Sequence, residues 1–186
     1  MSIKFNNISL MIIFLLYLIV MISTSNTGDK NEISLTIDST KGDGIITDFY
    51  YDDILKVIVN GKESNIFNYR NYLDEGENEI TIIFIYKLYS CQYMFYQLEN
   101  ILYINLSNID LSKVIYMEYM FYNCFSLKSI DLRNIDTSSV RYMDNIFSNC
   151  NSLIYLDLRR FNTSLVESMR YMFYNCESLF FIDLDN

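Results

Sequence analysis

Three aspartates, Asp131, Asp157 and Asp183, stand 26 residues apart in the second half of the chain. If successive copies of this segment stack as neighbouring strands, their carboxylates lie about 5 Å apart. A carboxylate pair at this separation is the arrangement used by retaining glycoside hydrolases. The column arises from the repeat itself, however, and implies no pocket. Glycan hydrolysis by stacked aspartates is therefore the least favoured of the functions considered.

Other catalytic chemistry is strongly restricted by composition. The 186 residues include no histidine, which removes the commonest general base, the commonest zinc ligand and every Ser-His or Cys-His dyad. No catalytic, cofactor-binding or metal-binding residue is predicted, and we expect a protein that is not an enzyme and needs no cofactor.

The aspartates belong to an internal repeat. The hexamer "YMFYNC" occurs at residues 119–124 and again at 171–176, and the related "NIFSNC" lies halfway between, at 145–150. Repeats of 26 residues begin at Val114, Val140 and Val166, and a weaker copy begins at Leu88. A fixed period of this length predicts stacked units that bury their apolar faces against each other.

Two hydrophobic patterns alternate within each repeat. The spacing of Leu153, Leu156 and Leu158 is the L-x-x-L-x-L pattern of a leucine-rich-repeat strand. The preceding segment has a spacing of three and four that predicts one face of a short helix, at Val140, Met143, Phe147 and Cys150. The predicted fold is an α/β repeat, a short leucine-rich-repeat-like solenoid with one strand and one short helix per unit.

Three regions are expected along the chain. Residues 1–25 form a signal peptide with the apolar run "LMIIFLLYLIVMI" and cleavage near Ser25, because thirteen apolar residues are short for a membrane span. An uncleaved signal anchor is the alternative. Residues 30–86 form a β-rich module of about four strands that caps the stack. Residues 88–186 hold about three and a half to four repeats, the last one truncated.

The cysteines follow the same period. Cys124, Cys150 and Cys176 occupy one inward column, and Cys91 aligns with the apolar slot of Met117. A disulfide between neighbours is conceivable in an exported protein. Buried free thiols that pack as small hydrophobic groups are favoured, and a metal site is disfavoured because no histidine joins them.

The outward positions of the predicted strands combine carboxylates, arginines and aromatic rings, which suits recognition of a protein or a glycan. A solvated sheet face, in which arginines offset the repulsion between aspartates, explains the same pattern. The predicted binding face consists of Tyr103, Asn105, Asp131, Arg133, Tyr155, Asp157, Arg159, Phe181 and Asp183. Sequons at Asn105 and Asn162 are candidate glycosylation sites.

Charge narrows the set of partners. The chain has 14 Lys and Arg against 23 Asp and Glu, a net charge of -9, which repels phosphate backbones. We expect a protein or glycan ligand at the cell surface and no nucleic acid. Membrane contact is expected only through the signal segment, if that segment is retained.

The repeated phrase V-x-x-M-x-x-M-F-x-x-C-x-S-L-x-x-I-D-L resembles the BspA-like leucine-rich repeat surface proteins, and residues 114–139 and 140–165 carry it most fully. The resemblance implies a secreted or cell-surface protein, often adhesive, with no known catalysis. Two departures are Leu98, where later repeats have cysteine, and an end at Asn186 without a C-terminal cap.

Taken together, these features predict an exported, non-catalytic surface protein that mediates adhesion or recognition through its strand face. The alternative is a structural building block of a surface array that self-associates through an open C-terminal edge.

Overall fold

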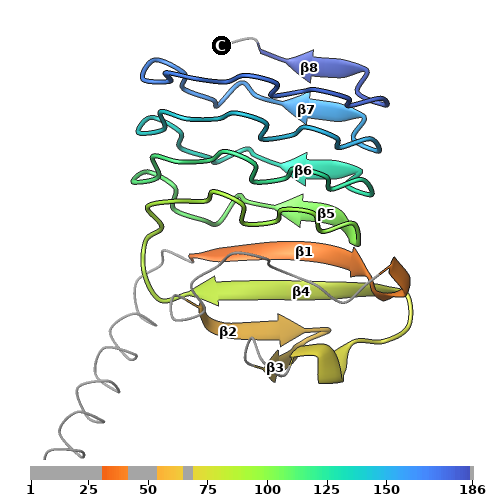
Figure 1. Cartoon of the computed structure of the whole chain (residues 1–186). Coiled ribbons are helices and arrows are strands. Elements are labelled where there is room, and N and C mark those ends of the chain that lie inside the picture. The colour runs from red at the N-terminus through yellow and green to blue at the C-terminus, as the bar shows by residue number, and fades with distance from the viewer. Residues whose placement is uncertain (1–30, 42–53, 65–68, 185–186) are drawn as a thin grey trace, which may run out of the picture. The chain divides into compact units, whose positions relative to one another are not determined.

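The structure is a computed structural model that describes residues 31–41, 54–64 and 69–184 (Figure 1). The expected signal peptide, residues 1–25, lies outside the described residues. The described elements are β1 (Glu32–Asp38), the 3-10 helix η1 (Ser39–Lys41), β2 (Ile54–Val59), β3 (Lys62–Ser64), the 3-10 helix η3 (Tyr69–Tyr72), β4 (Glu77–Phe84), β5 (Ile101–Asn105), β6 (Ser129–Asp131), β7 (Tyr155–Asp157) and β8 (Phe181–Asp183). No helix in these ranges is long and apolar enough to cross a membrane.

The region before the repeats is an antiparallel sheet in the order β3-β2-β4-β1. Strand β1 alternates as its sequence predicts: Ile33, Leu35 and Ile37 are buried, and the residues between them are partly exposed. The β2–β3 hairpin turns at Asn60 and Gly61, which both have positive φ angles (49° and 78°). Asn-Gly is the residue pair that two-residue hairpin turns prefer, because both central residues need positive φ angles.

Strand β1 joins this sheet to the repeats. It pairs antiparallel with β4 on one side and with β5 of the first repeat on the other, so that Leu35 lies between Ile80 and Ile104. Strand β5 then pairs parallel with β6, which gives one six-stranded sheet in the order β3-β2-β4-β1-β5-β6 (Figure 1). The lower edge of the first repeat is therefore covered by backbone hydrogen bonds.

In the second half of the chain, equivalent residues of successive repeats lie one above another. The rings of Phe95, Phe121, Phe147 and Phe173 form a stack with centroid distances of 5.6, 5.4 and 5.9 Å and nearly parallel planes. The predicted inward strand positions are buried in the first three repeats, as Leu153, Leu156 and Leu158 show in the third, whereas Leu184 of the fourth repeat is exposed. Strands β7 and β8 pair in parallel as a separate two-stranded sheet.

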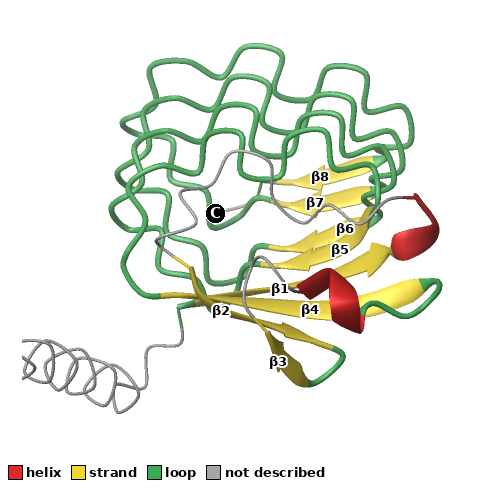
Figure 2. Cartoon of the chain, turned by 60° about the horizontal axis from the view of Figure 1, so that its bottom comes forward, coloured by secondary structure: helices red, strands yellow, loops and turns green. Residues whose placement is uncertain are grey.

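The predicted short helix in each repeat is wrong, because the described residues contain no α-helix and this segment forms successive turns (Figure 2). In the third repeat, Asn145 and Asn149 have positive φ angles of 57° and 61°, which interrupt any right-handed helix. The backbone amides of Ile146, Ser148 and Cys150 each donate to the carbonyl three residues earlier. The amides between them, of Asn145, Phe147 and Asn149, donate to carbonyls of the fourth repeat.

The apolar spacing of three and four is compatible with both arrangements, which is why it misled the prediction. A helix satisfies its amide groups internally, between residues four apart. Here half of them bond to the neighbouring repeat, so this segment holds the stack together along with the strands. The fold is consequently mostly β with repeating ladders of side chains, rather than α/β.

Candidate functional site

The predicted binding face lies along strands β5 to β8. Tyr103 and Tyr155 are 42% and 43% exposed, and Phe181 is more exposed still. Tyr155 stacks on Phe181 with a centroid distance of 5.8 Å and an angle of 5° between the ring planes. In β6 the equivalent position is Ser129, which pairs with Tyr103 in the parallel register. The aromatic column is therefore interrupted by one small side chain.

The acidic column beside it is paired with arginine. Arg133 forms two parallel contacts to Asp131, at 3.0 Å from Nε to Oδ1 and 2.7 Å from Nη2 to Oδ2. Arg159 contacts Asp157 in the same way, at 2.9 Å from Nε to Oδ1 and 2.6 Å from Nη2 to Oδ2. Its Nε also lies 3.3 Å from Asp183 Oδ2. The arginines thus offset the repulsion between stacked aspartates, and they place guanidinium groups along the face.

The same acidic column shapes the backbone. The side-chain Oδ1 atoms of Asn105, Asp131 and Asp157 each accept a hydrogen bond from the amide two residues later, at 2.8, 3.1 and 3.2 Å. These are Asx turns, which end each strand and direct the chain into the next loop. The column recurs partly because every repeat needs this turn.

The neighbouring arginines favour the ionised form of the Asp131 and Asp157 carboxyl groups. Hydrogen bonds from Arg133 and Arg159 lower the pKa values of Asp131 and Asp157 respectively. A glycosidase acid needs a carboxyl group with a raised pKa. The hydrolase alternative gains no support from this pair.

The two sequon asparagines also close turns. Asn105 is partly buried and accepts from the Ser107 amide, whereas Asn162 is exposed and accepts from the Ser164 amide at 3.0 Å. Asp110 and Asp136 form the equivalent turns in the first two repeats, through the amides of the serines two positions later. Of the two sequons, Asn162 has the more accessible side chain.

The comparison with protein families covers this same region. A family model described as "Mycoplasma protein of unknown function, DUF285" matches residues 89–185, just over half of the chain. The chain belongs to this family. The DUF285 match begins one residue after Leu88, where the first repeat was placed from the sequence. No curated protein and no solved structure matches the chain.

Within the DUF285 region the cysteines are free thiols. The Sγ atoms of Cys124, Cys150 and Cys176 lie 3.1, 3.2 and 2.9 Å from phenylalanine carbonyl oxygens of the preceding repeats. Burial raises the pKa of Cys124 to about 12 and also raises that of Cys150. The favoured prediction of buried free thiols is confirmed for Cys91, Cys124 and Cys150, whereas Cys176 is only partly buried. The three cysteines of the inward column also donate weak hydrogen bonds. No group of three or more Cys, Asp or Glu side chains in the described ranges is placed to hold a metal ion.

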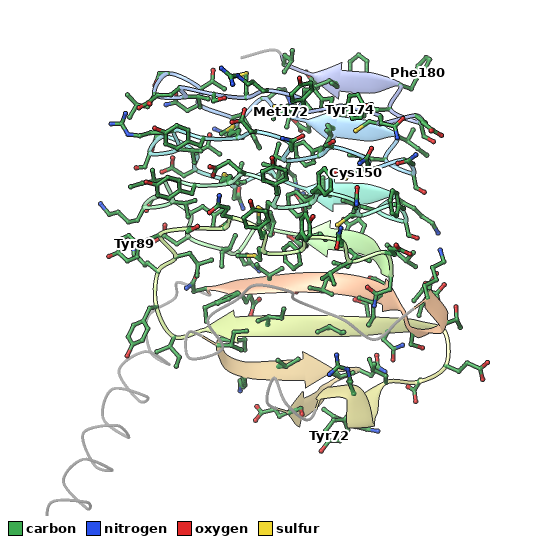
Figure 3. All side chains as sticks on the ribbon, in the orientation of Figure 1. Tyr72, Tyr89, Cys150, Met172, Tyr174 and Phe180 are labelled. Atoms are coloured by element: carbon green, nitrogen blue, oxygen red, sulfur yellow. The ribbon has the colours of Figure 1, made fainter. Side chains whose placement is uncertain are left out.

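The sequence interpretation missed an exposed apolar patch on the last two DUF285 repeats. Ile154 and Phe180 precede Tyr155 and Phe181, and they are 58% and 91% exposed. Figure 3 shows Phe180 at the surface of the last repeat. The Phe180 amide donates to the Ile154 carbonyl at 3.0 Å, so the two side chains belong to adjacent repeats in register. The 26-residue period places Leu102, Lys128, Ile154 and Phe180 at one position, but Leu102 is buried, so the period alone does not reveal the exposed pair.

Proposed function

We propose that this protein is exported to the cell surface and binds a surface protein or glycan through the face of strands β5 to β8. In this proposal, its DUF285 repeats form a short solenoid of the leucine-rich type. Support for the solenoid comes from the 26-residue register that links strands, turns and aromatic stacks of successive repeats. The likeness of the repeated phrase to BspA-like surface proteins supports export and adhesion.

The observation that carries the binding proposal is the exposed aromatic and apolar surface beside the arginine–aspartate row. Ile154, Tyr155, Phe180 and Phe181 expose large side chains on two adjacent repeats. Exposed large apolar side chains beside charged groups are typical of interaction sites. Such surfaces bind through aromatic anchors, with the charged rim setting orientation.

The test compares two aromatic columns of the same chain. Tyr155→Ser places in β7 the residue that β6 already has, and should weaken binding of the full-length protein to cells bearing the ligand by at least tenfold. Tyr116→Ser is the matched control: its ring stacks on Tyr142 at 5.6 Å in a column that ends in Ser90 and Ser168, away from the strand face.

Binding would be measured by flow cytometry with labelled protein, after thermal melts show that both variants fold. Equal loss in the two variants, or no loss in Tyr155→Ser, would reject the strand face. Intact mass of the native protein tests export separately, because a cleaved signal removes about 25 residues.

A second candidate is self-association through exposed aromatic and aliphatic side chains of the fourth repeat. Tyr171, Tyr174 and Leu184 are each more than half exposed there, and Met172 lies at the rim of the core cluster (Figure 3). Light scattering over a hundredfold concentration range would show a rising mass for an assembling block and a constant mass for a monomeric receptor.

A further inference from the structure

One position in the strand-face column has no ring although rings stand above and below it. Tyr103, Ser129 and Tyr155 occupy the same outward position of three successive repeats. Elsewhere in the chain, stacked aromatic neighbours one repeat apart have centroid distances from 5.1 to 5.9 Å. Since strands stack at about 4.8 Å, two repeats separate equivalent positions by about 10 Å. One inserted ring would therefore meet both tyrosines at the spacing that the chain itself uses.

The sheet is interrupted at this same level. Strand β6 ends the six-stranded sheet and β7 begins the two-stranded one, whereas β5–β6 and β7–β8 are paired ladders. The stacked Phe121 and Phe147 and the bonded Asn123 and Asn149 side chains hold the two repeats together on other sides. The interruption is local to the strand face and coincides with the missing ring.

A second interruption elsewhere shows what distinguishes Ser129. In the column of Tyr96, Tyr122 and Tyr174, the third repeat has Ser148 in place of tyrosine, and this serine is only 1% exposed. That position is already covered by neighbouring atoms. Ser129 is partly exposed, so a ligand can reach it.

Polar groups surround the ring-free position. Asn105 and Asp131 stand next to it in β5 and β6, and Arg133 lies beyond them with three-quarters of its side chain exposed. Arg133 uses Nε and Nη2 to hold Asp131, and Nη1 carries further donors of the five in a guanidinium group. Two flanking tyrosine side chains, with hydrogen-bonding groups along one side, define the chemistry of the ligand.

We propose that the position over Ser129, between Tyr103 and Tyr155, is a subsite for one hexopyranose ring of a neutral glycan. A pyranose offers C–H groups to an aromatic face above and below, and hydroxyl groups around its whole edge for Arg133, Asn105 and Ser129. A phenyl ring from a protein partner would stack equally well but would leave these polar groups unused. The base of a nucleic acid is disfavoured as the ligand, because the net charge of -9 repels the phosphates of the nucleic acid.

This subsite rests on the proposed function, since it assigns the ligand class for the same strand face. The sharpest variant is Ser129→Tyr, which fills the position with the residue found there in the first and third repeats. Its matched control is Ser90→Tyr, which extends the column of Tyr116 and Tyr142 by one ring outside the strand face. Both changes add a tyrosine to an existing tyrosine column.

The full-length protein would be applied to immobilised neutral glycans ending in galactose, glucose or mannose, and to their sialylated and sulfated forms. We expect binding to a subset of the neutral glycans, competed by the free hexose. Ser129→Tyr should lower this binding at least tenfold, and Ser90→Tyr should change it less than twofold. If Ser129→Tyr fails to fold in thermal melts, Tyr103→Ser removes one wall and should give the same loss.

The outcomes separate the subsite from the binding face. No glycan binding by the unaltered protein, or equal glycan binding by Ser129→Tyr, overturns the subsite even where the protein still adheres to cells through Tyr155. Loss of binding to a protein partner in Ser129→Tyr, without any glycan binding, also overturns it and points to an aromatic side chain as the guest. Adhesion that is insensitive to Tyr155→Ser rejects the proposed binding face itself.

Discussion

At the scale of single residues, the repeated cysteine does two things in the core. Each of Cys124, Cys150 and Cys176 fills a small apolar slot, and its Sγ contacts the carbonyl of a phenylalanine in the preceding repeat. Cysteine suits this slot because it packs as a hydrophobic group and is also a weak donor. Leu98 fills the equivalent position of the first repeat with an apolar side chain alone.

Alkylation should therefore distinguish the thiols. Under native conditions at pH 8, we expect iodoacetamide to modify Cys176 first, because it is partly exposed, and to modify Cys124 and Cys150 only as the protein unfolds. Thiolate is the reactive form, and burial that raises the pKa of Cys124 to about 12 suppresses it further. Peptide mass spectrometry over time gives the order. Rapid labelling of Cys150 in folded protein would contradict this packing.

A turn aspartate should make stability depend on pH. Hydrogen bonds from Lys87 and Ser112 lower the pKa of Asp110 to about 2, from an ordinary value of 3.8. Because the folded-state pKa is lowered, the carboxylate stabilises the protein fully above about pH 4, and this contribution is lost as the pH falls toward 2. Asp110→Asn should remove it, since an amide cannot ionise but can still close the turn, as Asn162 does in the third repeat.

Urea unfolding of the two proteins between pH 2 and 7 measures the effect. The difference in free energy of unfolding should be constant from pH 5 to 7 and shrink toward zero near pH 2. A difference that grows as the pH falls would mean that the carboxylate is not the stabilised form.

At the scale of elements, the turn segments of the second, third and fourth repeats each have an asparagine in the left-handed region, where the first repeat has Gln97. Asn123, Asn149 and Asn175 have φ angles between 56° and 61°. Their side-chain amides bond to one another in a ladder, at 2.6 Å and 3.0 Å. The partners of these side-chain amides are therefore the equivalent amides of neighbouring repeats.

Substitution can separate the backbone contribution from the amide contribution. Asn149→Gly keeps the left-handed turn but loses two amide contacts, and should cost about 1–3 kcal/mol of stability. Asn149→Ala loses the contacts and adds a left-handed alanine, which costs roughly a further 1–2 kcal/mol. Chemical denaturation gives both values. Equal stability of the two variants would show that the turn is not held in the left-handed region.

The element predictions succeeded where the local pattern has one solution and failed where it has two. The alternation in β1 specifies a strand, and the Asn60–Gly61 pair specifies a hairpin turn. The spacing of Met143, Phe147 and Cys150 fits a helix and a chain of turns equally well. The choice depends on whether amide groups find partners in the next repeat, which no single repeat contains.

At the scale of the whole molecule, β1 connects the N-terminal sheet to the stack of repeats. A core cluster of buried residues runs from Ile33 to Met172, and β1 and β5 share a ladder within it. Both regions should therefore unfold in one transition. Coincident thermal curves from far-ultraviolet circular dichroism and tyrosine fluorescence would show this.

Leu35→Ala tests the coupling. Leu35 is 1% exposed and lies between Ile80 and Ile104, so its truncation should cost about 2–5 kcal/mol and lower the melting temperature of the repeats as well as of the N-terminal sheet. Thr36→Ala, one residue away on the opposite face, is the control and should have a much smaller effect. A second transition that keeps its original temperature in Leu35→Ala would show that the repeats are independent of β1.

For the candidate binding face, too, the sequence period predicted one part and the folded structure was needed for the other. The nine residues assigned to it could be found from the period, because residues 26 apart occupy equivalent outward positions. The period does not show which of these side chains are available to bind a ligand. The contact of Arg159 with Asp183 and the stacking of Tyr155 on Phe181 depend on contacts between neighbouring repeats.

Periodicity and hydrophobicity were sufficient for the repeat length, for the inward strand positions of the first three repeats and for the buried thiols of Cys124 and Cys150, because each follows from local chemistry repeated in register. Three features required the folded chain: the turns in place of helices, the pairing of β1 with β5, and the sheet interruption beside Ser129. Each depends on which backbone groups of separate segments meet. Hydrogen bonding between distant segments is not encoded in the hydrophobic pattern of either one.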